Sequence, residues 1–281
     1  MQSSNPIFQR SGGFNGRAPA QPGGYPTYPG AGPSQGYAEP GHSDPSTWQT
    51  GGPVDVRERM TIDSVVQKTG LTMVILVAAA AVTWILLPDP TREIQPAITA
   101  WMAGAFGGLG LSLVLSFKRV ISPALVAVFA AVEGVFVGAM SMVFETMWPG
   151  VVMQAVFGTF VAFAATLAAY KFFNITVSPK FRKVVVISMF GFVGLMLFEF
   201  ALSLFGAEIG FGGFGTLGLL TACAGLVIGV LMLVLDFDFV ERGIEAGLPE
   251  VESWRAAFGL TVTMVWIYIN LLRILAILRG E

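Results

Sequence analysis

Charged residues are scarce in this chain of 281 residues: they make up 12% of it, against 54% for hydrophobic residues. Soluble domains carry about 25% charged residues. The composition therefore excludes an ordinary soluble protein and predicts an integral membrane protein, surrounded by a lipid bilayer. No basic patch with interleaved aromatic residues is present, and this argues against nucleic acid as a partner.

Histidine and cysteine are almost missing as well, because the chain has one of each, His42 and Cys223. One thiol cannot form an internal disulfide or a cysteine-rich metal site, so Cys223 is interpreted as small apolar filler. His42 precedes the apolar region, which removes histidine catalysis and histidine metal clusters from the membrane part. The sequence also lacks a P-loop, a GxGD aspartate motif and a Ser–His pairing. We therefore expect neither an enzyme nor a bound cofactor.

The N-terminal segment 1–54 is rich in Gly, Pro, Gln, Ser and Tyr, as in AQPGGYPTYPGAGPSQGYAEPG. Such a stretch cannot bury enough apolar surface to offset the entropy of ordering, so we predict a disordered tail. Residues 55–281 would form the membrane domain. This domain opens with a polar segment, VDVRERMTIDSVVQKTG, which is compatible with a short surface helix.

Seven apolar runs follow, each close to the roughly 17–25 residues that a membrane-spanning helix needs. They cover residues 71–88, 96–117, 123–147, 151–173, 183–205, 214–239 and 257–278. The runs predict an all-α bundle of seven transmembrane helices. Basic residues favour the cytoplasmic side, and here they gather on alternate connections, so the N-terminus is predicted to be cytoplasmic and the C-terminus outside. These residues are Lys118 and Arg119, then Lys171, Lys180, Arg182 and Lys183, and then Arg242 and Arg255.

Two aspartates end the sixth apolar run, in LMLVLDFDFVERG. Asp236 follows Gly229 by seven residues and so shares nearly the same helix face, whereas Asp238 points to about the opposite side, since each residue turns the helix by about 100°. Gly229 belongs to a stripe of small residues that permits close helix approach. We therefore predict that Asp236 faces into the bundle and that Asp238 reaches headgroup water. The stripe comprises Gly218, Ala222, Gly225 and Gly229, and a second stripe comprises Gly104, Gly108 and Ser112.

Three glutamates also lie in the apolar runs. Acids inside a membrane are candidates for function by default. For Glu133, deep in the third run, two interpretations remain: a structural hydrogen bond to a neighbouring helix, or a place on an ion path. Glu145, just before the sequence MWPG, is interpreted as an interface residue. Glu199 is expected to serve packing or pairing.

The last run carries four polar or amphipathic residues spaced by three or four positions, so they share one helix face. Its arginine, Arg273, has two interpretations: a counter-ion for a buried carboxylate, or a side chain that snorkels to the outer interface. The four residues are Thr263, Trp266, Asn270 and Arg273.

Several segments together resemble the Bax inhibitor-one, or YccA-like, family, in particular its actinobacterial branch. They are the start MQSSNPIF, MTIDSVVQKTG, EGVFVGAMSMVFE, and a helix ending in LVLDFD followed by a loop and IYINLLRIL. The resemblance covers essentially the whole chain. It implies six helices around a central seventh and a place in the bacterial plasma membrane.

Some bacterial members of that family are described as pH-sensitive calcium leak channels, in which an aspartate late in the sixth helix pairs with one in the seventh. Asp236 matches the first position, but Asn270 of IYIN occupies the second. Two carboxylates in contact share a proton and form a pH switch, whereas here Asp236 alone would ionise. Since Ca²⁺ prefers about 6–8 oxygen ligands, Asp236 is expected to offer at most a weak, transient calcium site.

The resemblance leads us to expect conduction or gating of a cation, Ca²⁺ or H⁺, along a path that Asp236 controls. The alternative is a non-conducting interaction protein. It would act through the tail and the helix faces and modulate a membrane protease or a stress-response assembly, as some family members are reported to do. The expected path residues are Asp236, Asn270, Glu133 and Arg273, with Glu199 and Asp238 as secondary candidates.

Overall fold

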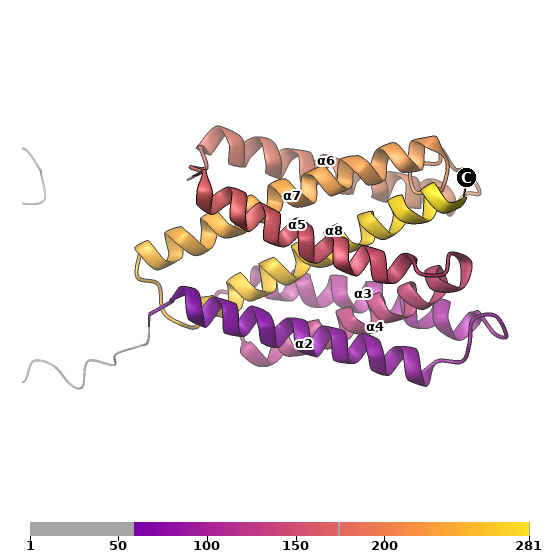
Figure 1. Cartoon of the computed structure of the whole chain (residues 1–281), viewed down its shortest axis with the longest axis horizontal. Helices are drawn as coiled ribbons and strands as arrows, with labels where there is room; N and C mark the ends of the chain where they lie inside the picture. Colours follow the sequence, from indigo (N-terminus) through magenta and orange to yellow (C-terminus); the bar gives the residue numbers. More distant parts are fainter. Residues whose placement is uncertain (1–58, 174, 281) are drawn as a thin grey trace, which may run out of the picture. The chain divides into compact units, whose positions relative to one another are not determined.

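Seven α-helices make up the part of the chain that the computed structural model describes, residues 59–173 and 175–280. The predicted tail and the predicted boundary at residue 54 lie outside these residues. All seven helices are long and apolar enough to cross a membrane, so the predicted all-α seven-helix fold is confirmed. Figure 1 shows α2 (Ile62–Leu86), α3 (Gln95–Phe117), α4 (Pro123–Met147), α5 (Val151–Phe172), α6 (Pro179–Ser203), α7 (Thr216–Glu245) and α8 (Glu252–Gly280).

Local capping explains where the first of these helices begins. The Thr61 hydroxyl accepts the N–H of Ser64, and the Ser64 hydroxyl accepts the N–H of Thr61, which is a reciprocal capping box. The helix then runs without a break from Ile62 through the apolar run. Residues 62–70 of the polar segment interpreted as a short surface helix therefore form the first part of α2. Proline near the first position opens α3, α4 and α6 in a similar way.

The last helix, α8, is the central one. It packs against α2, α4, α5 and α7, and Figure 1 shows it between α7 and α2. Helix α3 packs mainly on α4, and α6 packs mainly on α7. Helix α6 also contacts α8 through the rings of Phe192 and Trp266, whose centroids are 5.2 Å apart. The central seventh helix that the sequence resemblance implied is thus confirmed, with α3 and α6 as outer members of the bundle.

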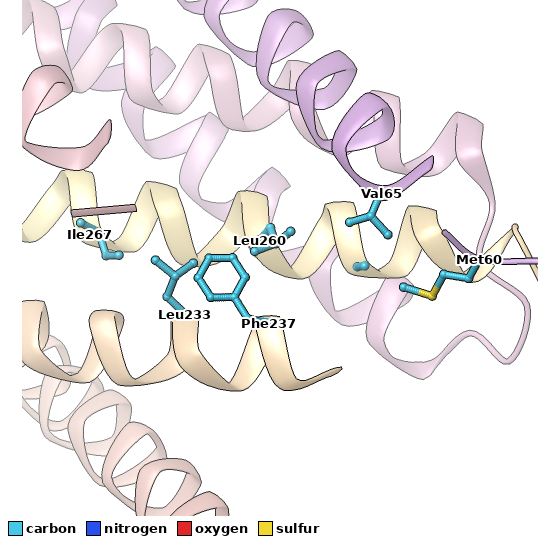
Figure 2. Close-up of a cluster of buried hydrophobic side chains, with 7 residues drawn as sticks. Met60, Val65, Leu233, Phe237, Leu260 and Ile267 are labelled. Atoms are coloured by element: carbon cyan, nitrogen blue, oxygen red, sulfur yellow. The ribbon is translucent and has the colours of Figure 1, made fainter. Parts of the chain in front are cut away.

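A cluster of buried apolar side chains joins α2, α7 and α8 near one end of the bundle. Figure 2 shows that α7 contributes a leucine and a phenylalanine that face α8. Between helices in a membrane, the stabilisation comes mainly from van der Waals packing, because lipid tails are as apolar as the side chains. The labelled members are Met60, Val65, Leu233, Phe237, Leu260 and Ile267.

Glycines mark the closest approaches between helices. A Cβ atom added to Gly104 would lie 2.7 Å from the backbone nitrogen of Phe136, and one added to Gly229 would lie 2.8 Å from the side chain of Ile267. Both distances are too short for a real carbon atom, so only glycine allows α3 to approach α4 and α7 to approach α8 this closely. The close contacts predicted from the two stripes of small residues are therefore confirmed at these positions.

The helix ends and their connections lie at two opposite ends of the bundle. One side, which we call the basic end, holds the start of α2 and the connections α3–α4, α5–α6 and α7–α8. Hydrogen bonds join these segments, as from Arg255 to the carbonyl of Arg119 at 2.9 Å and from Arg242 to the carbonyl of Val177 at 2.9 Å. The opposite end holds the other three connections and the end of α8.

Large apolar side chains are exposed along the outer helices, among them Val74 of α2, Phe106 of α3 and Phe190 of α6. In water such an extended apolar surface would be a liability. On helices of spanning length it is the surface that contacts the lipid bilayer.

Candidate functional site

Asp236 is a carboxylate within α7 that faces the central helix. Its Oδ2 atom accepts a hydrogen bond of 2.6 Å from the Thr263 hydroxyl of α8. Its Oδ1 atom lies 3.5 Å from the place where Gly259 would carry a Cβ, so a small residue on α8 leaves room for the carboxylate. No ion pair among the described residues includes Asp236. The prediction that it faces into the bundle is confirmed.

Asn270 is not the partner of Asp236, and this expectation was wrong. The Asn270 amide donates to the carbonyl of Trp266 at 2.8 Å, and its Oδ1 atom occupies the space where Gly225 would carry a Cβ. Gly225 precedes Asp236 by eleven residues, which is about 16 Å along a helix. Since α7 and α8 run antiparallel from a short connection, Asn270 lies much farther from that connection than Asp236 does.

Asp238 also differs from its prediction. It is expected to reach headgroup water, but its side chain is only 6% exposed and forms two ion pairs, 2.6 Å to Nη2 of Arg182 and 2.9 Å to Nε of Arg242. The expected difference in direction holds, because Asp236 faces α8 and Asp238 faces α6. The error lies in the surroundings: α6 covers that side of α7. We call Asp238, Arg182 and Arg242 the Asp238 cluster.

The sequence contained a signal for part of this cluster. Asp238 and Arg242 are separated by four positions on one helix, a spacing at which opposite charges pair. Arg182 lies 56 positions away and comes from α6, so only the tertiary fold brings it to Asp238. Thr263 was placed on the correct face of α8, since it contacts α7, but nothing local in the sequence identified its partner.

Arg273 and Glu199 both hold the α6–α7 connection, at the opposite end of the bundle from the Asp238 cluster. The Arg273 guanidinium donates to the carbonyls of Phe211, at 3.0 Å, and Gly213, at 3.4 Å. Arg273 is therefore not a counter-ion for any carboxylate among the described residues. Oε1 of Glu199 accepts the N–H of Gly210 at 2.8 Å, whereas Oε2 is buried without a hydrogen bond in the described part of the chain. This geometry agrees with a packing role for Glu199.

Glu133 belongs to the contact between α3 and α4. Its Oε2 atom lies 2.5 Å from the place where Gly108 would carry a Cβ, so the missing side chain of that glycine makes room for the carboxylate. The structural hydrogen bond considered for Glu133 is not formed with any described residue. Asp236 lies in the contact between α7 and α8, and no hydrogen bond or ion pair within residues 59–173 and 175–280 joins the two acids.

Glu145 has a local structural role. Its carboxylate accepts the backbone N–H groups of Gly150, at 2.5 Å, and Val152, at 3.1 Å. These groups begin α5, where Gly150 has a φ of +85° and offers no side chain for capping. An acid at a helix N-terminus satisfies free N–H groups and complements the helix dipole. The glutamate therefore closes the tight turn between α4 and α5.

A cavity of about 470 Å³ lies among α2, α4, α5 and α8 and is almost wholly apolar. Its polar side chains are already engaged within the protein: Ser141 and Tyr268 bond to each other at 2.6 Å, and Thr159 donates to the carbonyl of Ala155 at 2.8 Å. No carboxylate lines the cavity. It provides no ligands for a cation.

Metal-binding chemistry is limited by the small number of oxygen ligands. Among the described residues no group of three or more His, Cys, Asp or Glu side chains is placed to hold a metal ion. Asp236 and Thr263 together supply a carboxylate and a hydroxyl. Because Ca²⁺ takes about 6–8 oxygen ligands, these two groups alone cannot enclose a calcium ion.

Comparison with known families gives one match. A family model described as Bax inhibitor 1 like matches residues 5–280, and no curated protein matches the chain. The matched range includes all seven helices and both aspartates of α7. With this coverage and a seven-helix bundle built around its last helix, the chain belongs to the Bax inhibitor 1 like family.

Proposed function

We propose that this multi-pass membrane protein gates the passage of a cation, Ca²⁺ or H⁺, through the charge on Asp236. The observation that carries the proposal is an acidic side chain inside α7 with no basic partner in the described part of the chain, held against the central helix by Thr263. Burying a charged carboxylate away from water without a partner cation costs free energy. A negative Asp236 therefore strains the contact between α7 and α8, and a bound proton or cation relieves that strain.

Thr263 is suited to both states of Asp236. A hydroxyl group can donate to the carboxylate or accept from the protonated acid by rotating about its C–O bond. The bond to the ionised form is the stronger, since charge-assisted hydrogen bonds are about twice as strong as neutral ones. Because Asn270 lies elsewhere, the gate responds to the titration of one carboxylate and not to a proton shared between two.

For orientation, we propose that the basic end of the bundle faces the cytoplasm of a bacterial cell and that the protein lies in the plasma membrane. An excess of lysine and arginine in short connections characterises cytoplasmic loops, and the connections of the basic end have this excess. The connections at the opposite end carry Arg92, and the end of α8 carries Arg279. In this orientation Asp236 lies closer to the cytoplasmic surface than to the outer one.

The proposal is tested by ion flux in proteoliposomes that enclose a calcium-sensitive dye. We expect flux above that of protein-free liposomes for the wild type, and lower flux without dependence on pH for Asp236→Asn. Asp63→Asn is the control, because Asp63 is an exposed acid in the first turn of α2 and its loss leaves the α7–α8 contact intact. Background flux in both the wild type and Asp236→Asn would remove the gating proposal.

A second candidate, a non-conducting interaction protein, is favoured by a different observation. The acids inside the helices are not joined to one another: Glu133 lies between α3 and α4, Asp236 between α7 and α8, and Glu199 at the α6–α7 connection. Such a protein would modulate a membrane protease or a stress-response complex through segment 1–54. Deleting that segment distinguishes the two: loss of partner co-purification with unchanged flux supports interaction, and loss of flux supports transport. Neither candidate involves enzymatic catalysis.

A further inference from the structure

The Asp238 cluster has more positive than negative charge. One buried carboxylate, 6% exposed, pairs with two arginines whose side chains are 48% exposed for Arg182 and 51% exposed for Arg242. The negative charge is therefore enclosed, while both positive groups reach the surface of the basic end. After pairing, one positive charge is left uncompensated within the cluster.

The two guanidinium groups also keep unused hydrogen-bond donors. Arg182 donates to Asp238 through Nη2. Arg242 donates to Asp238 through Nε and to the carbonyl of Val177 through Nη2. A guanidinium carries five N–H donors in a planar fork, and the remaining ones have no partner among the described residues. Asp238 and Val177 thus fix the two groups in place and leave part of each fork free.

A cavity of about 360 Å³ adjoins these donors. Its polar lining comes from Arg182 and Arg242, and the rest of the lining is apolar or glycine: Leu235, Phe239, Gly243 and Leu248. Two fixed guanidinium forks over an apolar wall match a group that is anionic at one end and apolar at the other. Arginine forks bind phosphate oxygens in a bidentate manner.

The surrounding charges favour an anion. The segment that leads into α6, KFFNITVSPKFRK at residues 171–183, contains four basic residues and no acid. On α7, the nearby acids are Glu241, which accepts a hydrogen bond from Tyr170, and Glu245 at the exposed end of the helix. Neither of these acids lines the cavity.

We propose that Arg182 and Arg242 form a binding site for the phosphate group of an anionic ligand at the basic end of the bundle. Asp238 is a positioning residue: it fixes both guanidinium groups and does not touch the ligand. The phosphate can come from the headgroup of an anionic phospholipid or from free phosphate. Basic pockets between transmembrane helices at a membrane surface bind phospholipid headgroups in this way, and the apolar wall would then contact the upper part of an acyl chain.

The experiment measures ligand retention by the purified full-length chain in detergent, using native mass spectrometry. One arm adds phosphatidylglycerol and, separately, phosphatidylcholine. The other arm measures the melting temperature of the protein in inorganic phosphate. The reference is its melting temperature in chloride at the same ionic strength. Retention of phosphatidylglycerol over phosphatidylcholine without a response to phosphate identifies a lipid site. A response to both anions identifies a general phosphate site, and a response to neither overturns the proposal.

Variants locate the site. Arg182→Gln is expected to weaken phosphatidylglycerol binding about tenfold or more, the usual consequence of losing hydrogen bonds from a charged group. Arg182→Lys keeps the charge but loses the fork, so an intermediate loss is expected. The matched control is Arg119→Gln, which removes an exposed positive charge from the α3–α4 connection at the same end. Equal losses in Arg182→Gln and Arg119→Gln would show unspecific attraction and overturn the site.

Folding is checked for each variant by size-exclusion chromatography and melting temperature. Should Arg182→Gln fail to fold, Arg182→Lys and Arg242→Lys carry the test, because both keep a cation beside Asp238. Unchanged selectivity for phosphatidylglycerol in both lysine variants would then rule out recognition by the arginine forks. The outcome does not depend on ion flux, so the phosphate site and the gating proposal fail or stand separately.

Discussion

Among the described residues, the hydrogen bond between Thr263 and Asp236 is the direct polar link between the candidate gate and the central helix. A double-mutant cycle can measure it. The cycle compares the wild type, Thr263→Val, Asp236→Asn and the double variant. Valine has nearly the shape of threonine and removes only the hydroxyl group. Asparagine keeps an acceptor oxygen at the position of the carboxylate but removes its charge.

The expected magnitude follows from the geometry of the bond. At 2.6 Å the contact is a short one, as expected for a hydroxyl that donates to a charged oxygen. A hydrogen bond to a charged group contributes about 1.5–3 kcal/mol, and a neutral one about 0.5–1.5 kcal/mol. We therefore expect Thr263→Val to lower the free energy of unfolding by about 1.5–3 kcal/mol in the wild type, and by about 0.5–1.5 kcal/mol in the Asp236→Asn background. The difference is the coupling energy of the pair.

The assay is reversible unfolding in mixed micelles, followed by the fluorescence of the tryptophans. Thr166→Val is the matched control, because the Thr166 hydroxyl donates only to the carbonyl of Ala162 in its own helix, at 2.7 Å. Its substitution is expected to show no coupling to Asp236→Asn. A coupling energy of zero between positions 236 and 263, or one equal to that of the control, would refute the assigned bond and with it the link between the charge on α7 and the central helix.

Three further predictions concern the frame around the site, and the same unfolding assay checks them. Gly104→Ala should lower the free energy of unfolding by about 1–3 kcal/mol, because the added methyl group overpacks against the Phe136 backbone. Gly110→Ala should not lower it, since a Cβ atom there would meet nothing within 4 Å. Equal effects of the two substitutions would contradict the close α3–α4 contact. Glu145→Ala should lower the free energy of unfolding by about 0.5–2 kcal/mol, because it removes a helix cap. An unchanged value would show that Glu145 does not cap α5. Asp238→Asn should lower the free energy of unfolding by more than the ~1 kcal/mol of exposed ion pairs but by less than the ~3–5 kcal/mol of fully buried ones, because both arginines are half-exposed. An unchanged free energy of unfolding would contradict the ion pairs of the Asp238 cluster.

Hydropathy located all seven helices. At the basic side it gave the ends of α3, α4 and α5 within one residue but missed those of α2, α6, α7 and α8. The sixth apolar run was predicted to end at residue 239, whereas α7 continues to Glu245, and α8 begins at Glu252 and not at residue 257. Hydropathy measures the part of a helix that lies in hydrocarbon. A helix also continues into water wherever backbone hydrogen bonds, caps and side-chain ion pairs support it, as the pair between Arg255 and Glu252 does at the start of α8.

The assumed partnership of Asp236 and Asn270 could have been tested from the sequence alone. Two antiparallel helices joined by a short connection pair residues at similar distances from that connection. Taking Leu248 as the middle of the connection, Asp236 lies 12 positions before it and Asn270 lies 22 positions after it. Thr263, 15 positions after Leu248, fits the register. Similarity to a family motif suggested Asn270 as the partner of Asp236, whereas the helix register favours Thr263.

The surroundings of Asp238 could not have been derived in the same way. Helix geometry gives the angle between Asp236 and Asp238, but it does not tell which of the two sides another helix covers. That depends on the packing of α6 on α7, which places Arg182 beside Asp238. A buried carboxylate and a hydrated one are thus indistinguishable in the sequence LDFDF, because the difference comes from a segment more than fifty residues away.

Asp236 and Asp238 therefore differ in their neighbouring positive charges, although they lie within one turn of α7. Asp238 is overcompensated by two arginines, which tie the basic end of α7 to α6 and to the carbonyl of Val177. Asp236 has no compensating cation in the described part of the chain, and its polar link to α8 is the Thr263 hydroxyl. Because the ion pairs hold the end of α7 in place, a change of charge at Asp236 acts on the α7–α8 contact and cannot be relieved by movement of that end. Under the gating proposal, loss of the arginines should therefore alter how ion flux responds to the charge on Asp236, even though neither arginine touches it.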